Sequence, residues 1–352
     1  MSSLRNKRIK WFLLFPLFVI LIVLTYYQLL YRAPKTGNHV SKSTKVFSHH
    51  RSQVWSAKFS PDGSLIASGS VDSTAVIIDM RTDKVLKVLK HPAGLTYLCF
   101  SGDGNSLITS SYDGVVRLWD VSSGSLRKEF LGHSNTIRTV DISPDGKLIA
   151  SGGEESVIKL WDVETGKCIN NLKGHTLTVW DVKFSRDGSK LASGSFDNTF
   201  KIWNVNDGKL LSTVYGHSQA VVSLAFSNNG KMLATTSDDK TIKIWRVGDN
   251  KLLNELQQPE HPQAVCFSPD DELLITAGRD KPLIGEFLQE IFGDSHFDPG
   301  ISMRLWDVRT GKMLQTFTAH FNDVNDVDFS PDGKTILSAS SDSDVRLWQI
   351  AR

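Results

Sequence analysis

The chain has 352 residues, and its 40 Lys and Arg nearly balance 38 Asp and Glu, giving a formal net charge of +2. This balance, and the lack of any Lys or Arg run interleaved with aromatic residues, gives no support to nucleic-acid binding. Cys99, Cys168 and Cys266 are too few and too scattered for a disulfide framework, so we interpret them as buried apolar positions.

The N-terminal segment predicts a single-pass membrane anchor. Residues 1–10 are short and basic, and residues 11–31 contain no charged side chain. At ~1.5 Å per residue, a helix of this length crosses a hydrocarbon core of ~30 Å. A cleaved signal peptide and a buried core helix are alternatives. The segment after Leu30 lacks a small-x-small cleavage pattern. We therefore predict an uncleaved transmembrane helix over residues 11–31.

Charges beside this span predict its orientation. Four basic residues lie just before the span, at Arg5, Lys7, Arg8 and Lys10, and two lie just after it, at Arg32 and Lys35. The positive-inside tendency then leaves the N-terminus in the cytoplasm and the rest of the chain outside it. The absence of an Asn-x-Ser/Thr sequon favours a bacterial envelope. Residues 32–44, which are polar and contain Pro34 and Gly37, predict a flexible linker.

From residue 45 to residue 352 the chain repeats a unit of about 42 residues. Trp119, Trp161, Trp203 and Trp245 follow one another at intervals of 42. Within one unit, short apolar runs are joined by Asp-Gly turns, and residues 200–205 alternate with the period of a strand. A fixed period of this size indicates a repeat architecture. We predict an all-β fold.

Several marks recur in register and resemble WD repeats. They are Gly-His pairs, an Asp six residues before a Trp, and Trp-Asp endings such as Trp161-Asp162. The resemblance covers about 300 of the 352 residues and implies a seven-bladed β-propeller over residues 45–352. It also implies that a His, a Ser or Thr, an Asp and a Trp form a hydrogen-bonded set inside each blade. Four sets match in full: His91, Thr109, Asp113 and Trp119; His175, Ser193, Asp197 and Trp203; His217, Thr235, Asp239 and Trp245; His320, Ser338, Asp342 and Trp348.

The other three units depart from this pattern. Glu155 stands where Asp is expected, Ile78 stands where Trp is expected, and in the sixth unit the nearby His261 is displaced along the chain. A Ser-His-Asp set can mark a hydrolase. The same hydrogen-bonded set can stabilise every blade of a repeat fold, whereas catalysis needs only one site. We therefore interpret the sets as structural.

The ends of the repeat array predict how the ring closes. The last unit stops after its third strand, and residues 45–48 resemble a fourth strand. We therefore predict that the N-terminal strand completes the seventh blade and removes the exposed edge.

One unit carries an insertion, because Trp306 follows Trp245 by 61 residues. The extra segment, residues 283–301 in blade 6, places Phe287 and Ile291 on one apolar helical stripe. This element either packs on its own propeller or serves as a lid or docking helix.

The face that carries the Gly-His loops is the predicted interaction surface. Aromatic residues and Arg, which are enriched at interface hot spots, occur there at equivalent positions of several units. With the two residues of the insertion, the candidate partner-binding residues are Trp55, Tyr112, Arg138, Trp180, Phe196, Arg279, Phe287 and Ile291. Trp55 and Trp180 alternate with inward-facing residues, so a place in the core remains an alternative for both.

We therefore predict a non-enzymatic, membrane-anchored scaffold that binds a protein or peptide, without cofactor or metal. The rival hypothesis is an enzyme or small-ligand site in the central channel. The sequence has no HExxH, no GxSxG and no phosphate-binding Gly loop. Clustered carboxylates or histidines with strongly shifted pKa values at the channel would favour the rival.

Overall fold

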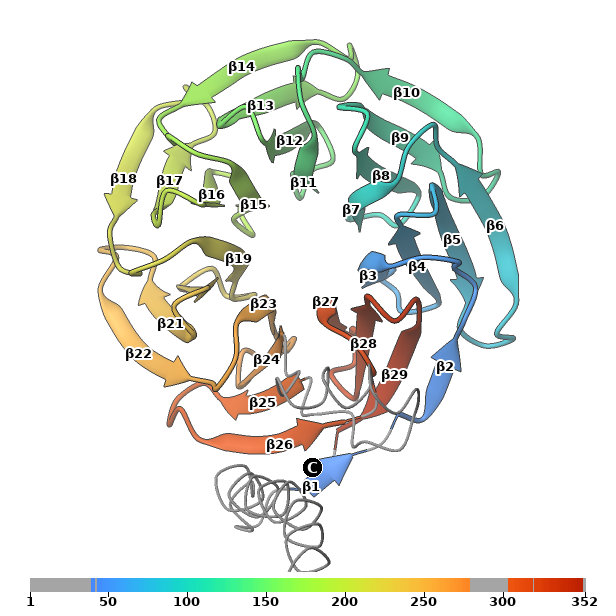
Figure 1. Ribbon diagram of the computed structural model, residues 1–352. Coiled ribbons are helices and arrows are strands. Elements are labelled where there is room, and N and C mark those ends of the chain that lie inside the picture. The colour runs from blue at the N-terminus through green and yellow to red at the C-terminus, as the bar shows by residue number, and fades with distance from the viewer. Residues whose placement is uncertain (1–38, 42, 279–302, 319, 351–352) are drawn as a thin grey trace, which may run out of the picture. The chain divides into compact units, whose positions relative to one another are not determined.

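The described part of the molecule is a seven-bladed β-propeller. The computed structural model describes residues 39–41, 43–278, 303–318 and 320–350. They form seven sheets arranged around a central axis (Figure 1). This confirms the predicted fold class and the number of blades. Among the described residues, no helix is long and apolar enough to cross a membrane. The predicted span, residues 11–31, lies outside the described residues.

Each blade is an antiparallel sheet whose first strand lines the axis and whose last strand lies at the circumference. The first three blades comprise β3 (Val54–Phe59), β4 (Leu65–Ser70), β5 (Thr74–Asp79) and β6 (Val85–Lys90); β7 (Leu95–Phe100), β8 (Ser106–Ser111), β9 (Val116–Asp120) and β10 (Leu126–Phe130); and β11 (Ile137–Ile142), β12 (Leu148–Gly153), β13 (Val157–Asp162) and β14 (Cys168–Lys173). Blades 4 and 5 comprise β15 (Val179–Phe184), β16 (Lys190–Ser195), β17 (Phe200–Asn204) and β18 (Leu210–Val214); and β19 (Val221–Phe226), β20 (Met232–Ser237), β21 (Thr241–Arg246) and β22 (Leu252–Gln257). Blades 6 and 7 comprise β23 (Pro262–Phe267), β24 (Leu273–Gly278), β25 (Met303–Asp307) and β26 (Met313–Phe317); and β27 (Val324–Phe329), β28 (Thr335–Ser340) and β29 (Val345–Gln349).

Local turn chemistry explains why each unit folds into short strands. In the turn after β15, Gly188 has a φ of +70°, which costs glycine little. Asp187 accepts hydrogen bonds from the Ser185 hydroxyl at 2.6 Å and from the Ser189 amide at 3.0 Å. In the other units an Asp or Asn followed by a residue with positive φ occupies the same turn, so the chain reverses direction at a fixed interval along the sequence.

The apolar cores lie between neighbouring blades. One cluster joins Ile158 and Leu160 of blade 3 to Val182, Leu191 and Trp203 of blade 4. All five side chains are buried. A single repeat therefore cannot bury its apolar face, which is why the ring must be complete to be stable.

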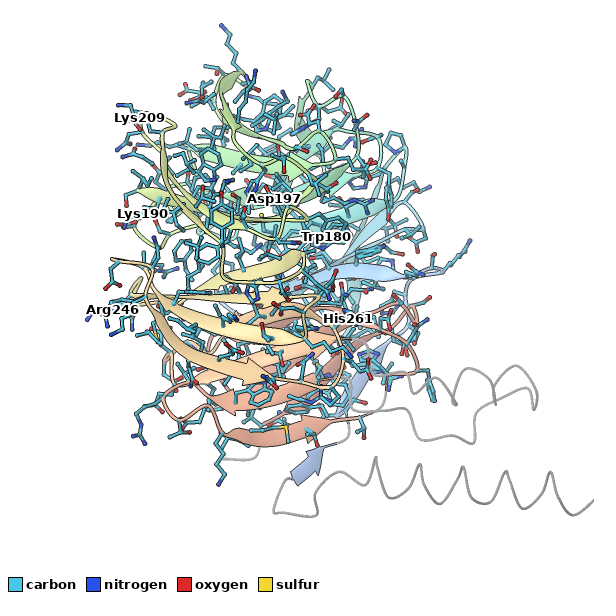
Figure 2. The ribbon with its side chains drawn as sticks, turned by 60° about the vertical axis from the view of Figure 1, so that its left-hand side comes forward. Trp180, Lys190, Asp197, Lys209, Arg246 and His261 are labelled. Carbon is cyan, nitrogen blue, oxygen red and sulfur yellow. The ribbon has the colours of Figure 1, made fainter. Side chains whose placement is uncertain are left out.

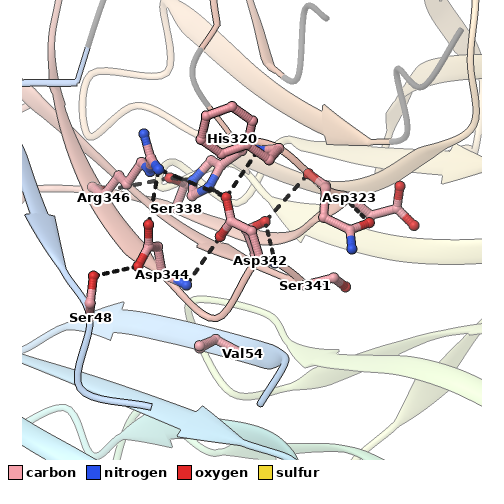
Figure 3. A network of polar contacts seen from close by, with 12 residues as sticks. Ser48, Val54, His320, Asp323, Ser338, Ser341, Asp342, Asp344 and Arg346 are labelled. Atoms are coloured by element: carbon pink, nitrogen blue, oxygen red, sulfur yellow. Dashed lines mark hydrogen bonds and ion pairs between the residues drawn. The ribbon is translucent and has the colours of Figure 1, made fainter. Parts of the chain in front are cut away.

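The chain closes the ring as predicted. Strand β2 (Lys45–Phe47) pairs antiparallel with β29, so the N-terminal strand is the fourth strand of blade 7. Figure 3 shows the junction, where the Ser48 hydroxyl donates to Asp344 at 2.5 Å. Phe47 is buried in the core that joins blades 7 and 1.

Part of the predicted linker is ordered in the ring. Residues 32–44 were predicted to be flexible, but β1 (His39–Ser41) pairs in parallel with β26 and gives blade 6 a fifth strand (Figure 1). Three residues are too few to show a strand period, and the pairing depends on the open edge of a distant element. The insertion at 283–301, with Phe287 and Ile291, and the nearby Arg279 lie outside the described residues.

Candidate functional site

Three of the four complete His/Ser-Thr/Asp/Trp sets have the predicted geometry. In blade 4, His175 contacts Asp197 through Nδ1 at 2.8 Å and Ser193 through Nε2 at 2.7 Å, and the Trp203 indole N–H donates to the same hydroxyl at 2.8 Å. The sets of blades 5 and 7 repeat this arrangement with His217 and His320. Ser193 is fully buried, so its hydroxyl is inaccessible to a substrate.

The set predicted in blade 2 is incomplete. His91 contacts Thr109 at 2.9 Å, but its Nδ1 lies beside the Leu89 carbonyl and not beside Asp113. Asp113 is bound instead by the Arg117 guanidinium at 2.8 Å. In the complete sets the residue after His donates its backbone N–H to the Asp, as Thr176 does to Asp197 at 3.1 Å in blade 4. Blade 2 has Pro92 at this position, which has no N–H to donate.

The remaining blades substitute other groups for the missing members. In blade 3, Glu155 Oε1 lies 2.5 Å from His133 Nδ1, although the two are not in hydrogen-bond alignment. In blade 6, Gln258 takes the place of His, and its Oε1 accepts the Thr276 hydroxyl at 3.0 Å. The sequence contained the signal for Gln258, because His and Ser or Thr are 18 residues apart in every set.

Burial lowers the pKa of several imidazoles in the sets. Burial lowers the pKa of His91 and that of His133 to about 4. Burial also lowers the pKa of His175, although hydrogen bonding to Asp197 opposes the shift. For Asp197, burial acts to raise the pKa, but the hydrogen bonds from His175 and Thr199 outweigh it and lower the pKa. In blades 4 and 7, where burial lowers the pKa of His175 and His320, a neutral imidazole is held by a carboxylate whose pKa is also lowered, and the pairing satisfies groups that are costly to bury unpaired.

Four of the eight predicted partner-binding residues form one continuous cluster, which we call the rim cluster: Tyr112, Arg138, Trp180 and Phe196. The Arg138 guanidinium lies 5.6 Å from the ring centroid of Tyr112 and 4.9 Å from that of Trp180. The Trp180 and Phe196 rings are stacked, with centroids 4.7 Å apart and planes 11° from parallel. Phe196 is 37% exposed and the other three side chains are half-buried.

The rim cluster lies on the face that carries the Gly-His loops. The Phe196 amide donates to the Thr178 carbonyl at 3.0 Å, and the Tyr112 amide donates to Gly94 at 2.9 Å, so both turns bond directly to these loops. Figure 2 shows Trp180 and His261 well away from Lys190, Lys209 and Arg246, which lie along the opposite edge. Trp55 is half-buried on the wall of the channel, and its indole N–H has no hydrogen-bond partner among the described residues.

A cavity of about 770 Å³ occupies the central channel and is lined by the first strands of all seven blades. Two ion pairs lie in it, Lys58 with Asp326 and Lys183 with Asp181, both at 2.7 Å. Tyr97 lies between the two lysines, and its hydroxyl accepts a hydrogen bond from Lys183 at 3.1 Å. Trp55, Arg138 and Trp180 also line this cavity, so the rim cluster borders the channel.

Two further channel carboxylates have shifted pKa values. Burial raises the pKa of Asp141 and that of Asp328 to about 6. Asp141 accepts the backbone N–H of Phe184 at 2.7 Å, and Asp328 accepts that of Phe59 at 2.9 Å. Both contacts join one blade to the next. Shifts of this kind favour a ligand-binding channel, but the two carboxylates lie in different blades, 3 and 7, and each also holds its blade to the next one.

Comparison with known families agrees with this geometry. The family model described as "WD domain, G-beta repeat" matches residues 41–79, 83–120, 124–162, 166–204, 208–246, 251–281 and 311–349. The chain belongs to the WD40 repeat family. Each matched segment begins at or just before an outer strand; six of the seven end in the third strand of the next blade, and the segment 251–281 ends before β25.

Individual relatives match this WD40 protein over short stretches. It is 37% identical over 84 residues to the COMPASS component SWD3 of Saccharomyces cerevisiae, covering 24% of this chain and 27% of the relative. It is 32% identical over 104 residues to a WD repeat-containing protein WDS homolog of Arabidopsis thaliana, covering 28% and 20%. A guanine nucleotide-binding protein subunit beta-1 of Homarus americanus matches at 30% over 96 residues, covering 26% and 28%. The match thus spans between 20% and 28% of each relative's length.

Proposed function

We propose that this WD40 propeller is a non-enzymatic scaffold that binds a protein or peptide through the rim cluster. The stacked chain of Tyr112, Arg138, Trp180 and Phe196 carries the proposal. The names of two relatives, a COMPASS component and a G protein subunit, describe parts of multiprotein assemblies, which supports a protein partner.

The rim cluster has the properties of an interface hot spot. Arg138 is held between two aromatic rings and forms an ion pair with Glu154 at 2.6 Å. Its side chain therefore loses little conformational entropy when a partner binds. Phe196 exposes part of an aromatic ring that is already stacked on Trp180, and aromatic residues and Arg dominate measured binding energies.

Substitution of Phe196 tests the proposal with little risk to the fold, because 37% of its surface is exposed. Tagged wild type and Phe196→Ala are compared by quantitative enrichment from cells, with Leu211→Ala as the control. Leu211 is 51% exposed on β18 of the same blade, away from the rim cluster. A hot-spot residue contributes about 2 kcal/mol or more, so we expect Phe196→Ala to lose about 30-fold in partner affinity. Equal enrichment by both variants, with unchanged thermal stability, would reject the rim cluster as the binding site.

We also propose that residues 11–31 anchor the scaffold in a membrane and that the propeller is extracytoplasmic. The uncharged stretch and the basic residues before it support this orientation. Protease added to intact cells tests it with a C-terminal tag. Digestion of the tag from outside is the expected result, whereas a tag protected until the membrane is opened would place the propeller in the cytoplasm. A protein released by washing would reject the anchor.

The channel supports a second candidate function, binding of a small ligand or catalysis within the cavity. The observation that favours it is the pair of carboxylates with raised pKa values, Asp141 and Asp328, in a cavity of about 770 Å³. Because each carboxylate already accepts a backbone N–H from the next blade, we place this candidate second. A screen for small-molecule stabilisation of wild type against Asp141→Asn would separate the two functions.

A further inference from the structure

Blade 1 differs from the other six blades on its outward-facing surface. In the third strand of each other blade, one equivalent position is always basic: Arg117, Lys159, Lys201, Lys243, Arg304 and Arg346. In blade 1 this residue is Val76. Its partner on the outer strand is Val88, whereas blades 2 to 5 pair the basic residue with Glu129, Asn171, Thr213 and Glu255.

The substitution leaves an apolar surface on β6. Val88 is 51% exposed and Leu86 is 46% exposed, while Val76 beneath them is buried. The polar links of the other blades, such as Arg117 with Glu129 at 2.8 Å and Lys201 with Thr213 at 2.9 Å, have no counterpart here. Exposed leucines also occur on other outer strands, but each of those has a polar residue at the position of Val88; in blade 7 that position is the exposed Val46, which pairs with the basic Arg346.

The same strand is strongly basic. Lys84, Lys87 and Lys90 lie within seven residues, and none of them forms an ion pair with another described residue. The nearby Asp83 is already paired with Lys45. Leu86, Val88 and Lys90 are exposed, whereas Lys87 is half-buried and Leu89 is buried, so apolar and basic groups share the outward side. We call the exposed residues Lys84, Leu86, Val88 and Lys90 the β6 patch.

This combination limits what can cover the strand. Two copies of the chain would bring the lysines of one β6 patch against those of the other, and like charges placed opposite one another are destabilising. A few side chains are also too small an area for a stable protein interface, which needs ~800 Å² from each partner. A negatively charged lipid surface avoids the repulsion between like charges and does not need a large contact area. Each Lys contributes independently near the headgroups, and short apolar side chains can enter the interface.

The β6 patch lies on the arc of the ring that follows the start of the described chain. The described ring begins at β1, on the edge of blade 6, and continues through β2, the outer strand of blade 7. Along the circumference, β6 follows β2 (Figure 1). The apolar residues 11–31 precede this arc in the sequence. We infer that the β6 patch docks onto an anionic lipid surface. The inference rests on the proposed anchor only in that the anchor would bring the ring near a membrane. The pattern of charged and apolar residues on β6 does not depend on the anchor.

Hydrogen exchange of β6 in lipid nanodiscs tests the inference with the full chain. Nanodiscs of phosphatidylcholine are compared with nanodiscs that also contain phosphatidylglycerol, at low salt and at about 1 M salt, where the Debye length is ~3 Å. We expect the outward amides of β6 to exchange several-fold more slowly only with phosphatidylglycerol and only at low salt. One charge near such a surface changes association about fivefold, so Lys90→Glu, a change of two charges, should weaken it roughly 25-fold.

Matched variants separate docking from general effects. Leu86→Asp is paired with Leu211→Asp, which has similar exposure on β18, and Lys90→Glu is paired with Lys173→Glu at the equivalent position of β14. Only the β6 variants should lose the protection. Equal exchange in both lipids, or protection that survives high salt, would overturn the inference. Protection by poly-glutamate without lipid dependence would assign the patch to an acidic protein partner and would also overturn it.

Failure of the anchor is distinguishable from failure of docking. If the chain does not enter either nanodisc, the anchor proposal fails, and flotation with vesicles then measures docking alone. Salt-sensitive flotation only with phosphatidylglycerol vesicles, lost in Lys90→Glu, would uphold the inference. No flotation with either vesicle would overturn it.

Discussion

Removal of the Phe47 side chain should destabilise the whole ring although the residue lies near the start of the described chain. Phe47 is 4% exposed and belongs to the core formed by Val54, Val345 and Leu347 of blades 1 and 7. Burial of a Phe contributes about 2–3 kcal/mol, and the cavity left by truncation adds to the loss. We therefore expect Phe47→Ala to lower the free energy of unfolding by about 3–4 kcal/mol.

The neighbouring residue is a matched control. Val46 lies on the same strand but is 44% exposed, so Val46→Ala should change the free energy of unfolding by less than about 0.5 kcal/mol. Urea unfolding followed by tryptophan fluorescence measures both variants, since the Trp residues occur in blades throughout the ring. A loss in Phe47→Ala no larger than that in Val46→Ala would refute the conclusion that β2 closes the propeller.

Three further predictions concern the blades and the channel. Ser193→Ala should cost about 2 kcal/mol in thermal unfolding, because it leaves a buried imidazole and indole without their shared partner, whereas Ser189→Ala in an exposed turn should be near neutral. Gly153→Ala should be strongly destabilising, since a Cβ would lie 2.1 Å from a backbone carbonyl, whereas Gly248→Ala meets nothing within 4 Å; equal melting temperatures would contradict this. Asp141→Asn should stabilise the protein at pH 8 and lose this advantage toward pH 4. The folded state binds more protons than the unfolded state between 3.8 and about 6, so wild-type stability falls as pH rises through that window. The same stabilisation at both pH values would contradict the raised pKa.

The regular parts of the fold could be predicted from the sequence because they depend on local signals repeated at a fixed interval. Asp187 and Gly188 mark a turn by their own chemistry, and Trp203 marks the end of a unit. Closure by residues 45–48 was predictable because the last unit lacks a fourth strand. The pairing of β1 with β26 was not, since it depends on an open edge more than 270 residues away in the sequence.

The candidate site was predictable in composition but not in arrangement. Aromatic residues and Arg at equivalent positions indicated Arg138, Trp180 and Phe196, but only the structure shows that they stack on one another. Asp113 pairs with Arg117 outside its set, and Pro92, which has no N–H to donate to Asp113, occupies a position that the four-residue motif does not include. The pKa of Asp141 depends on burial inside the channel, which no local pattern reports.

The central claim is that the rim cluster binds a protein, and site-specific photo-crosslinking in intact cells tests it most directly. A photoreactive amino acid is placed at position 196 in the rim cluster and, as the control, at position 211 on β18, with wild-type residues elsewhere. We predict a discrete protein adduct from position 196 that is lost when Arg138→Ala is added, and no such adduct from position 211. No adduct from position 196, or the same adducts from both positions, would contradict the claim.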